Sequence, residues 1–118
     1  METDAVRHIK DPLYETLRQE DIAAFNAEKS ARSELPGFAH GDFRGLDLRG
    51  LDAQRLDLSH AYFRGADLRG IDFSHSLMEG ASIAGAKISG CFFPHKLAAE
   101  EIVMSLNHGT RMRYCAQQ

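Results

Sequence analysis

The chain has 118 residues, a formal net charge of −3 and a pI near 6.0, which allows one domain with a modest core. This balance excludes a strong overall attraction to DNA or to an anionic membrane. No apolar run approaches the roughly 18–20 residues that cross a bilayer. Cys91 and Cys115 are too few for a disulfide framework. Because the N-terminus is polar and acidic, unlike a secretory signal, we expect a reduced, cytoplasmic protein.

Residues 1–35 are expected to form an N-terminal helical cap. Asp11 is suited to the N-cap position of a helix, and Pro12 to the first helical position. An apolar stripe then continues over two short helices interrupted near Asp21. The stripe consists of Leu13, Leu17, Ile22 and Phe25.

From residue 36 to residue 95 the sequence repeats every five residues, within an expected repeat domain of residues 36–96. Asp recurs at five-residue spacing or a multiple of it, and twelve pentads run without a break. The fifth place of a pentad is usually Gly or His, and every third place is apolar. These apolar centres are Phe38, Phe43, Leu48, Ala53, Leu58, Phe63, Leu68, Phe73, Met78, Ile83, Ile88 and Phe93.

Neither a helix nor a straight strand keeps such centres on one face. Five residues turn a helix by about 500°, and an odd period places every second centre on the opposite face of a strand. The pattern fits a chain that bends once in every pentad, with Gly or His at the bend. The first and third places then point inward, and the second and fourth point outward.

The pentads "LDLRG" (46–50), "LDLSH" (56–60) and "ADLRG" (66–70) resemble the motif A-(D/N)-L-x-x of the pentapeptide-repeat family. The resemblance implies a mainly β fold, a right-handed quadrilateral β-helix with four pentads per coil. This solenoid would have about three coils, with short α-helical segments at both ends. Residues twenty apart should then be stacked. The expected organisation is a cap at 1–35, a repeat domain at 36–96 and a capping helix with a tail at 97–118.

The C-terminal segment 97–118 combines helical spacing with a stop signal. Leu97, Ile102, Val103 and Leu106 are spaced for one helix face, and Gly109 is placed to end the helix. The tail after Gly109 is expected to be mobile. The helix can cap its own core or pack against a second copy. Family members often dimerise through this end, so the resemblance makes a homodimer plausible, and both arrangements stay open.

The repeated aspartates are interpreted as structural, because catalytic carboxylates need to converge in a cleft. The stacked pairs His40/His60 and His75/His95 offer too few ligands for a metal site. Cys91 is expected to be buried, and Cys115 has no partner residues for nucleophilic catalysis. We therefore predict no enzyme, no catalytic residue, no metal and no cofactor.

Arginines beside the aspartates make two walls of the rod more basic than the other two. Face one carries Asp42, Arg44, Tyr62 and Arg64, and face two carries Asp47, Arg49, Asp67, Arg69 and Lys87. Arg and Tyr are favoured in binding hot spots. The alternative is a solvated surface on which these charges pair with one another. The predicted protein-binding patch consists of Arg44, Arg49, Tyr62, Arg64, Arg69 and Lys87.

The leading functional hypothesis is a non-catalytic protein–protein interaction or scaffold module with an unidentified protein partner. A rigid rod loses little conformational entropy on binding. The family resemblance supplies an alternative, a DNA mimic that binds DNA gyrase or topoisomerase and gives quinolone resistance. The neutral repeat region disfavours mimicry. Direct nucleic-acid binding is not expected, because the sequence has no groove-reading helix or broad basic surface.

Overall fold

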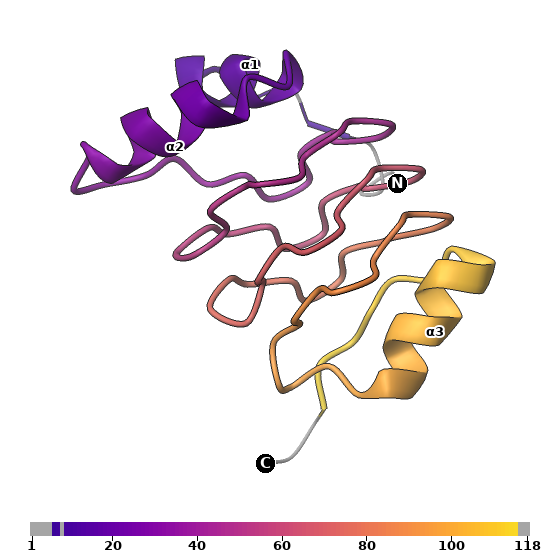
Figure 1. The fold of residues 1–118 in the computed structure, drawn as a ribbon. Coiled ribbons are helices and arrows are strands. Elements are labelled where there is room, and N and C mark those ends of the chain that lie inside the picture. Colours follow the sequence, from indigo (N-terminus) through magenta and orange to yellow (C-terminus); the bar gives the residue numbers. More distant parts are fainter. Residues whose placement is uncertain (1–5, 8, 116–118) are drawn as a thin grey trace.

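The computed structural model describes residues 6–7 and 9–115. Three helices are present in this part of the chain: α1 (Pro12–Arg18), α2 (Ile22–Ser30) and α3 (Ala99–His108). Figure 1 shows α1 and α2 at one end of a wound region and α3 at the other. We use the name wound region for residues 38–93.

The two N-terminal helices begin where the sequence predicts. The Asp11 carboxylate accepts a hydrogen bond from the Leu13 amide at 2.8 Å, and Pro12 opens α1. Asp21 caps α2 by accepting from the Ala24 amide at 3.2 Å. These side chains satisfy amides that have no partner within the helix. The interruption near Asp21 is therefore confirmed.

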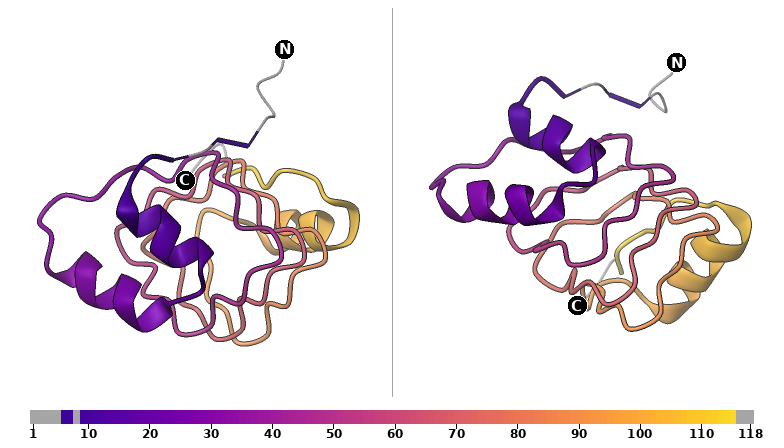
Figure 2. Two further views of the ribbon diagram at one scale, coloured as in Figure 1. Left: turned by 90° about the horizontal axis from the view of Figure 1, so that it is seen from above. Right: turned by 45° about the horizontal axis from the view of Figure 1, so that its top comes forward.

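The wound region brings residues twenty apart into contact. Isolated parallel bridges join Asp42 to Tyr62 and Tyr62 to Ser82, and others join equivalent positions along the walls. Seen along the axis of winding, successive circuits superpose (Figure 2). Inside, the Phe43 and Phe63 rings stack with centroids 5.4 Å apart. The predicted pairing of residues twenty apart is confirmed.

The apolar centres fill the inside of these circuits. All of them are buried except Ile88 and Phe93, which are partly exposed at the C-terminal end. Leu13, Leu17 and Phe25 of the N-terminal helices are also buried and extend the same core. One continuous core therefore runs from the helical end through the winding.

The predicted fold class, a mainly β right-handed quadrilateral β-helix, is wrong for this structure. The described residues contain isolated bridges but no β-strand and no sheet, and their regular secondary structure is the three short helices. A turn in nearly every pentad explains the difference, because the extended stretch between two turns is too short for consecutive bridges. The structure is described by its three helices and by stacked, turn-rich circuits.

Most of the bends require a left-handed backbone. His40, Arg55 and His60 have φ near +60° to +70°, a conformation that is unfavourable for residues with a side chain. Gly80 has φ +79°, and a Cβ there would overlap the His60 ring. Glycine at residue 80 is therefore required both by the backbone and by the neighbouring circuit.

The C-terminal segment differs from expectation in two ways. Gly109 ends α3 with φ +75°, as predicted, but Val103 is 53% exposed and does not share the core-facing side of Ile102 and Leu106. The tail was expected to be mobile, yet Met112 is buried and its amide donates to the Ala81 carbonyl at 2.9 Å. That prediction is wrong up to Cys115, and residues 116–118 lie outside the described part. No helix among the described residues is long and apolar enough to cross a membrane.

Candidate protein-binding surface

The six repeated aspartates brace their own turns. Each carboxylate accepts a hydrogen bond from the backbone amide two residues later, at 2.9–3.3 Å. This local bond stabilises a bend in the chain. The aspartates are Asp42, Asp47, Asp52, Asp57, Asp67 and Asp72. Their geometry is that of turn supports, and they do not converge on a common point.

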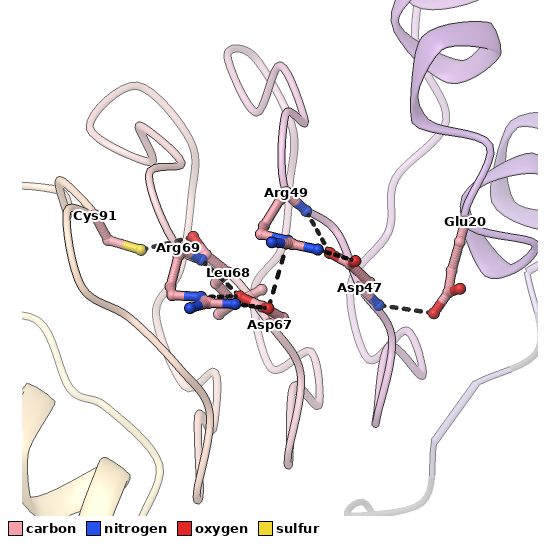
Figure 3. Close-up of polar contacts among 7 residues, drawn as sticks. All are labelled: Glu20, Asp47, Arg49, Asp67, Leu68, Arg69 and Cys91. Carbon is pink, nitrogen blue, oxygen red and sulfur yellow. Dashed lines mark hydrogen bonds and ion pairs between the residues drawn. The ribbon is translucent and has the colours of Figure 1, made fainter.

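On face two, the arginines are held by the aspartates of their own pentads (Figure 3). Arg49 donates two hydrogen bonds to Asp47 at 2.9 and 2.7 Å, and Arg69 binds Asp67 in the same way. Arg49 also lies 3.4 Å from Asp67, which links the two circuits. Such two-point pairs combine charge with fixed geometry.

These contacts change the acidity of the carboxyl groups. The Arg69 guanidinium holds the pKa of Asp67 well below its usual value, and Arg49 lowers the pKa of Asp47. Both carboxylates are therefore charged at neutral pH, and each offsets an arginine. For Arg49 and Arg69, the structure matches the alternative of a self-paired surface.

Face one is different, because Arg64 is exposed and makes no ion pair or side-chain hydrogen bond within the described residues. Arg44 is paired with Asp42 at 2.7 Å. Tyr62, between them in the wall, carries the Arg111 guanidinium over its ring, 5.3 Å from the centroid. The wall thus presents arginine groups around one aromatic ring.

A hollow of about 300 Å³ opens on this wall. Arg111 reaches it from the C-terminal segment and donates to the Tyr62 hydroxyl at 2.8 Å and to the Gly80 carbonyl at 3.1 Å. We call this site the face-one hollow. Its lining residues are Arg44, Tyr62, Arg64, Ser82, Gly109 and Arg111. Among the described residues it is lined by three arginines and by no carboxylate. Because Arg44 is already paired with Asp42, the exposed Arg64 is the group that suits an anionic partner.

The structure therefore divides the predicted patch. Arg44, Tyr62 and Arg64 meet at the face-one hollow, whereas Arg49, Arg69 and Lys87 lie on the other wall. Lys87 is exposed and has no ion pair among the described residues. Arg111 was missed, because the tail was expected to be mobile and nothing in its sequence places it over Tyr62.

The sequence does contain a signal for the unpaired cations. Paired arginines follow an aspartate by two residues, as in Asp47 and Arg49. The pentad "AYFRG" has Tyr62 at that place, so Arg64 lacks its acidic neighbour. The pentad "AKISG" has Lys87 itself there and no acid. Within the predicted patch, the missing aspartate identifies Arg64 and Lys87, the two cations without an ion pair among the described residues.

The histidines and cysteines make contacts within the fold. The His40 and His60 rings stack with centroids 4.9 Å apart, while His75 and His95 show no ring contact in the described part of the chain. The Cys91 thiol donates to the Leu68 carbonyl at 2.9 Å, and burial raises its pKa. Among the described residues, no cluster of three or more His, Cys, Asp or Glu side chains is placed to hold a metal.

Comparison with known proteins identifies the repeats. Residues 57–93 match the family model of pentapeptide repeats in 8 copies. This segment belongs to the pentapeptide-repeat family. No curated protein and no solved structure gives a significant match. The match over residues 57–93 is compatible with a non-catalytic repeat protein and assigns no specific role.

Proposed function

We propose that this pentapeptide-repeat protein is a non-catalytic protein-interaction module that binds an acidic segment of a partner protein at the face-one hollow. The observation that carries the proposal is Arg64, an exposed arginine that has no carboxylate partner among the described residues and lies at the rim of a hollow with two further arginines. Arginine and tyrosine contribute strongly to binding when a partner removes them from water.

The rigidity of this wall supports recognition. Tyr62 is tied to the circuits on either side by its two bridges, and its hydroxyl accepts a hydrogen bond from Arg111. A surface that is already ordered loses little conformational entropy when it binds. An acidic side chain placed in the hollow would meet the exposed Arg64 guanidinium beside Arg44 and Arg111, whose guanidinium groups are held by hydrogen bonds.

The paired aspartates weaken the alternative of DNA mimicry. Mimicry requires a run of unscreened negative charge, and on face two the carboxylates of Asp47 and Asp67 are offset by Arg49 and Arg69. A gyrase supercoiling assay tests this alternative directly, and we expect the protein to leave supercoiling unchanged.

A homodimer through α3 stays a prediction. Val103 and Met104 are about half exposed on that helix and border a hollow of about 450 Å³. Sedimentation equilibrium over a range of concentrations measures the oligomeric state.

The decisive experiment compares a variant of Arg64, which has no ion pair among the described residues, with a variant of Arg69, which is paired with Asp67. Tagged wild-type protein, Arg64→Gln and Arg69→Gln are used for affinity capture from the native cell, followed by mass spectrometry. We expect proteins that are retained by the wild type and by Arg69→Gln to be lost with Arg64→Gln. Equal retention by all three, with the variants folded by circular dichroism, contradicts the proposal.

A further inference from the structure

The last circuit of the wound region has an open side, separate from the face-one hollow. In earlier circuits, the amide at the third place of a pentad donates to the circuit that follows, as Leu68 does to Lys87 at 2.9 Å. The Gly70 amide does the same to Ser89 at 3.0 Å, and Phe73 to Phe92 at 2.7 Å. No further circuit follows the last one, so its backbone amides either bind another part of the chain or remain without a hydrogen bond.

The C-terminal segment provides that partner along residues 78–85. The Met78 amide donates to the Tyr114 hydroxyl at 2.8 Å, and the Ile83 amide to the Ser105 hydroxyl at 3.0 Å. The Gly80 and Gly85 amides donate to backbone carbonyls of the same segment. This part of the final circuit is therefore closed.

Residues 86–93 lack such a cover. The amides of Ile88, Gly90 and Phe93 make no hydrogen bond within the described part of the chain, and neither do the carbonyls of Ala86 and Cys91. Ile88 and Phe93 are partly exposed, and Phe92 is 66% exposed. We call residues 86–93 the open edge. It combines a row of backbone donors and acceptors with apolar side chains.

Charge indicates which kind of segment fits this edge. No acidic residue lies between Glu79 and Glu100, whereas Lys87 and Lys96 are exposed there and make no ion pair among the described residues. Asp67, the neighbour of Lys87 in the preceding circuit, is already bound by Arg69 and Arg49 (Figure 3). An incoming chain beside Lys87 therefore gains from a carboxylate of its own.

We propose that the open edge binds an extended acidic-apolar segment of another protein by continuing the backbone hydrogen bonding of the wound region. In the register of the circuits below, the first residue of the segment lies beside Lys87. Its amide donates to the Ala86 carbonyl, and its carbonyl accepts from the Ile88 amide. The carbonyls two and five residues later accept from Gly90 and Phe93. Backbone pairing supplies affinity, and the side chains supply selectivity.

The first residue of the segment is acidic, because it faces Lys87, and the second is apolar, because it covers Ile88. A second copy of the chain does not fit. At the other end of the ladder, the amides of Asp42, Asp47 and Asp52 are already bound by side chains of α1, of α2 and of the turn between them, so head-to-tail stacking meets occupied donors. Joining two open edges brings the lysines of both copies into one interface.

The test uses the full chain and a synthetic peptide, acetylated and amidated, with the sequence DLRGIDF as a stand-in for the foreign segment. The peptide is titrated into ¹⁵N-labelled protein, and amide resonances are followed by NMR. We expect saturable shifts at Ile88, Gly90 and Phe93. A peptide with the first Asp replaced by Lys should bind about tenfold more weakly.

Exchanging the charges of Lys87 and of the first peptide residue distinguishes specific pairing from nonspecific binding. Lys87→Glu should weaken binding of the original peptide by about tenfold and restore binding of the peptide that begins with Lys. Because Lys87 is exposed and its side chain has no partner among the residues that the structure describes, the variant is expected to fold. Arg64→Gln should leave this binding unchanged, which separates the open edge from the face-one hollow.

Several results overturn the proposal. They are the absence of shifts at the three amides, shifts confined to Val103 and Met104, and equal binding of the two peptides. Concentration-dependent shifts without peptide would identify a second copy as the occupant. Strong protection of these amides in the free monomer would mean that the chain covers its own edge.

Discussion

The two ends of the wound region close their backbone in different ways. At the N-terminal end, side chains from α1, α2 and the turn between them accept the exposed amides one by one. Tyr14, Glu20 and Asn26 accept from Asp42, Asp47 and Asp52 respectively, at 2.8–3.2 Å. At the C-terminal end, one helix and an extended segment cover residues 78–85 and leave residues 86–93 open.

In this molecule, the backbone amides at the end of the stack are all bound only where the acceptors of the cap match the spacing of those amides. The three N-terminal acceptors are six residues apart, and the amides that they meet are five residues apart. The pair of short helices therefore follows the ladder across two bends. A single helix and one extended segment follow only part of it. Solenoid-like stacks in general require such terminal caps.

The largest expected effect comes from the ion pair that fastens α2. The Lys29 side chain is 2% exposed, and its ammonium group lies 3.1 Å from Asp52. Asp52→Asn leaves the buried Lys29 ammonium without its counter-ion, a change that costs roughly 3–5 kcal/mol in a fully buried pair. Because the Asp52 side chain is 46% exposed, we expect a smaller loss, about 2 kcal/mol in the free energy of unfolding. Chemical denaturation measures it.

Lys29→Met is the matched control, because it removes the buried charge and keeps the length of the side chain. We expect it to be close to neutral, and to cancel the cost of Asp52→Asn in the double variant. An Asp52→Asn protein as stable as the wild type would show that α2 is held by its apolar contacts alone.

A smaller effect is expected at the other end, at Ser105. This buried hydroxyl accepts the Ile83 amide at 3.0 Å. Ser105→Ala leaves that amide buried and unpaired, at a cost of about 1–2 kcal/mol. Hydrogen exchange should accelerate at Ile83 and Gly85 but not at Leu48. Ser82→Ala, which removes only a long exposed contact at 3.5 Å, serves as the control. Uniform acceleration over the whole chain would argue against a local cap.

The smallest effect concerns pH and the ion pair between Glu101 and Arg113. Arg113 lowers the pKa of Glu101 below its usual value of 4.5. The pair therefore stabilises the fold above that pH, and the stabilisation is lost as the pH falls through the lower, folded-state pKa. Glu101→Gln should lower the thermal midpoint slightly at pH 7 and have no effect at the acidic end of the titration.

Glu100→Gln, one residue away, is the control for this titration. Glu100 makes no ion pair in the described part of the chain. If both variants change the midpoint equally at every pH, the effect comes from the net charge of α3 rather than from the contact with Arg113.

Much of the framework could be predicted from the sequence because it depends on local rules. The five-residue period predicts the bends, the family resemblance implies the pairing of Phe43 with Phe63, and Asp11, Asp21 and Gly109 mark helix boundaries that the structure contains. The predicted β class failed for a local reason as well. The same period that produces the bends keeps the extended stretches too short to form strands.

The candidate site was only partly predictable. A count of charges does not distinguish face one from face two, although their arginines differ in whether they are bound by a carboxylate. Whether an arginine is free depends on the residue two places before it, which is Tyr62 for Arg64 and Asp67 for Arg69. That signal is present in the sequence. The contribution of Arg111 to the hollow is not.

The family resemblance supplied the spacing of twenty residues between paired positions. The sequence by itself determined where the chain bends, which places of a pentad are buried, where α1 and α2 begin and where α3 ends. These features follow from backbone preferences and from periodic burial of apolar side chains. Only the tertiary structure decided that Lys29 is buried against Asp52, that Arg111 covers Tyr62, and that the last circuit is half closed. The physical reason is that these contacts join segments far apart in the chain, and no local preference specifies how the caps are placed on the stack.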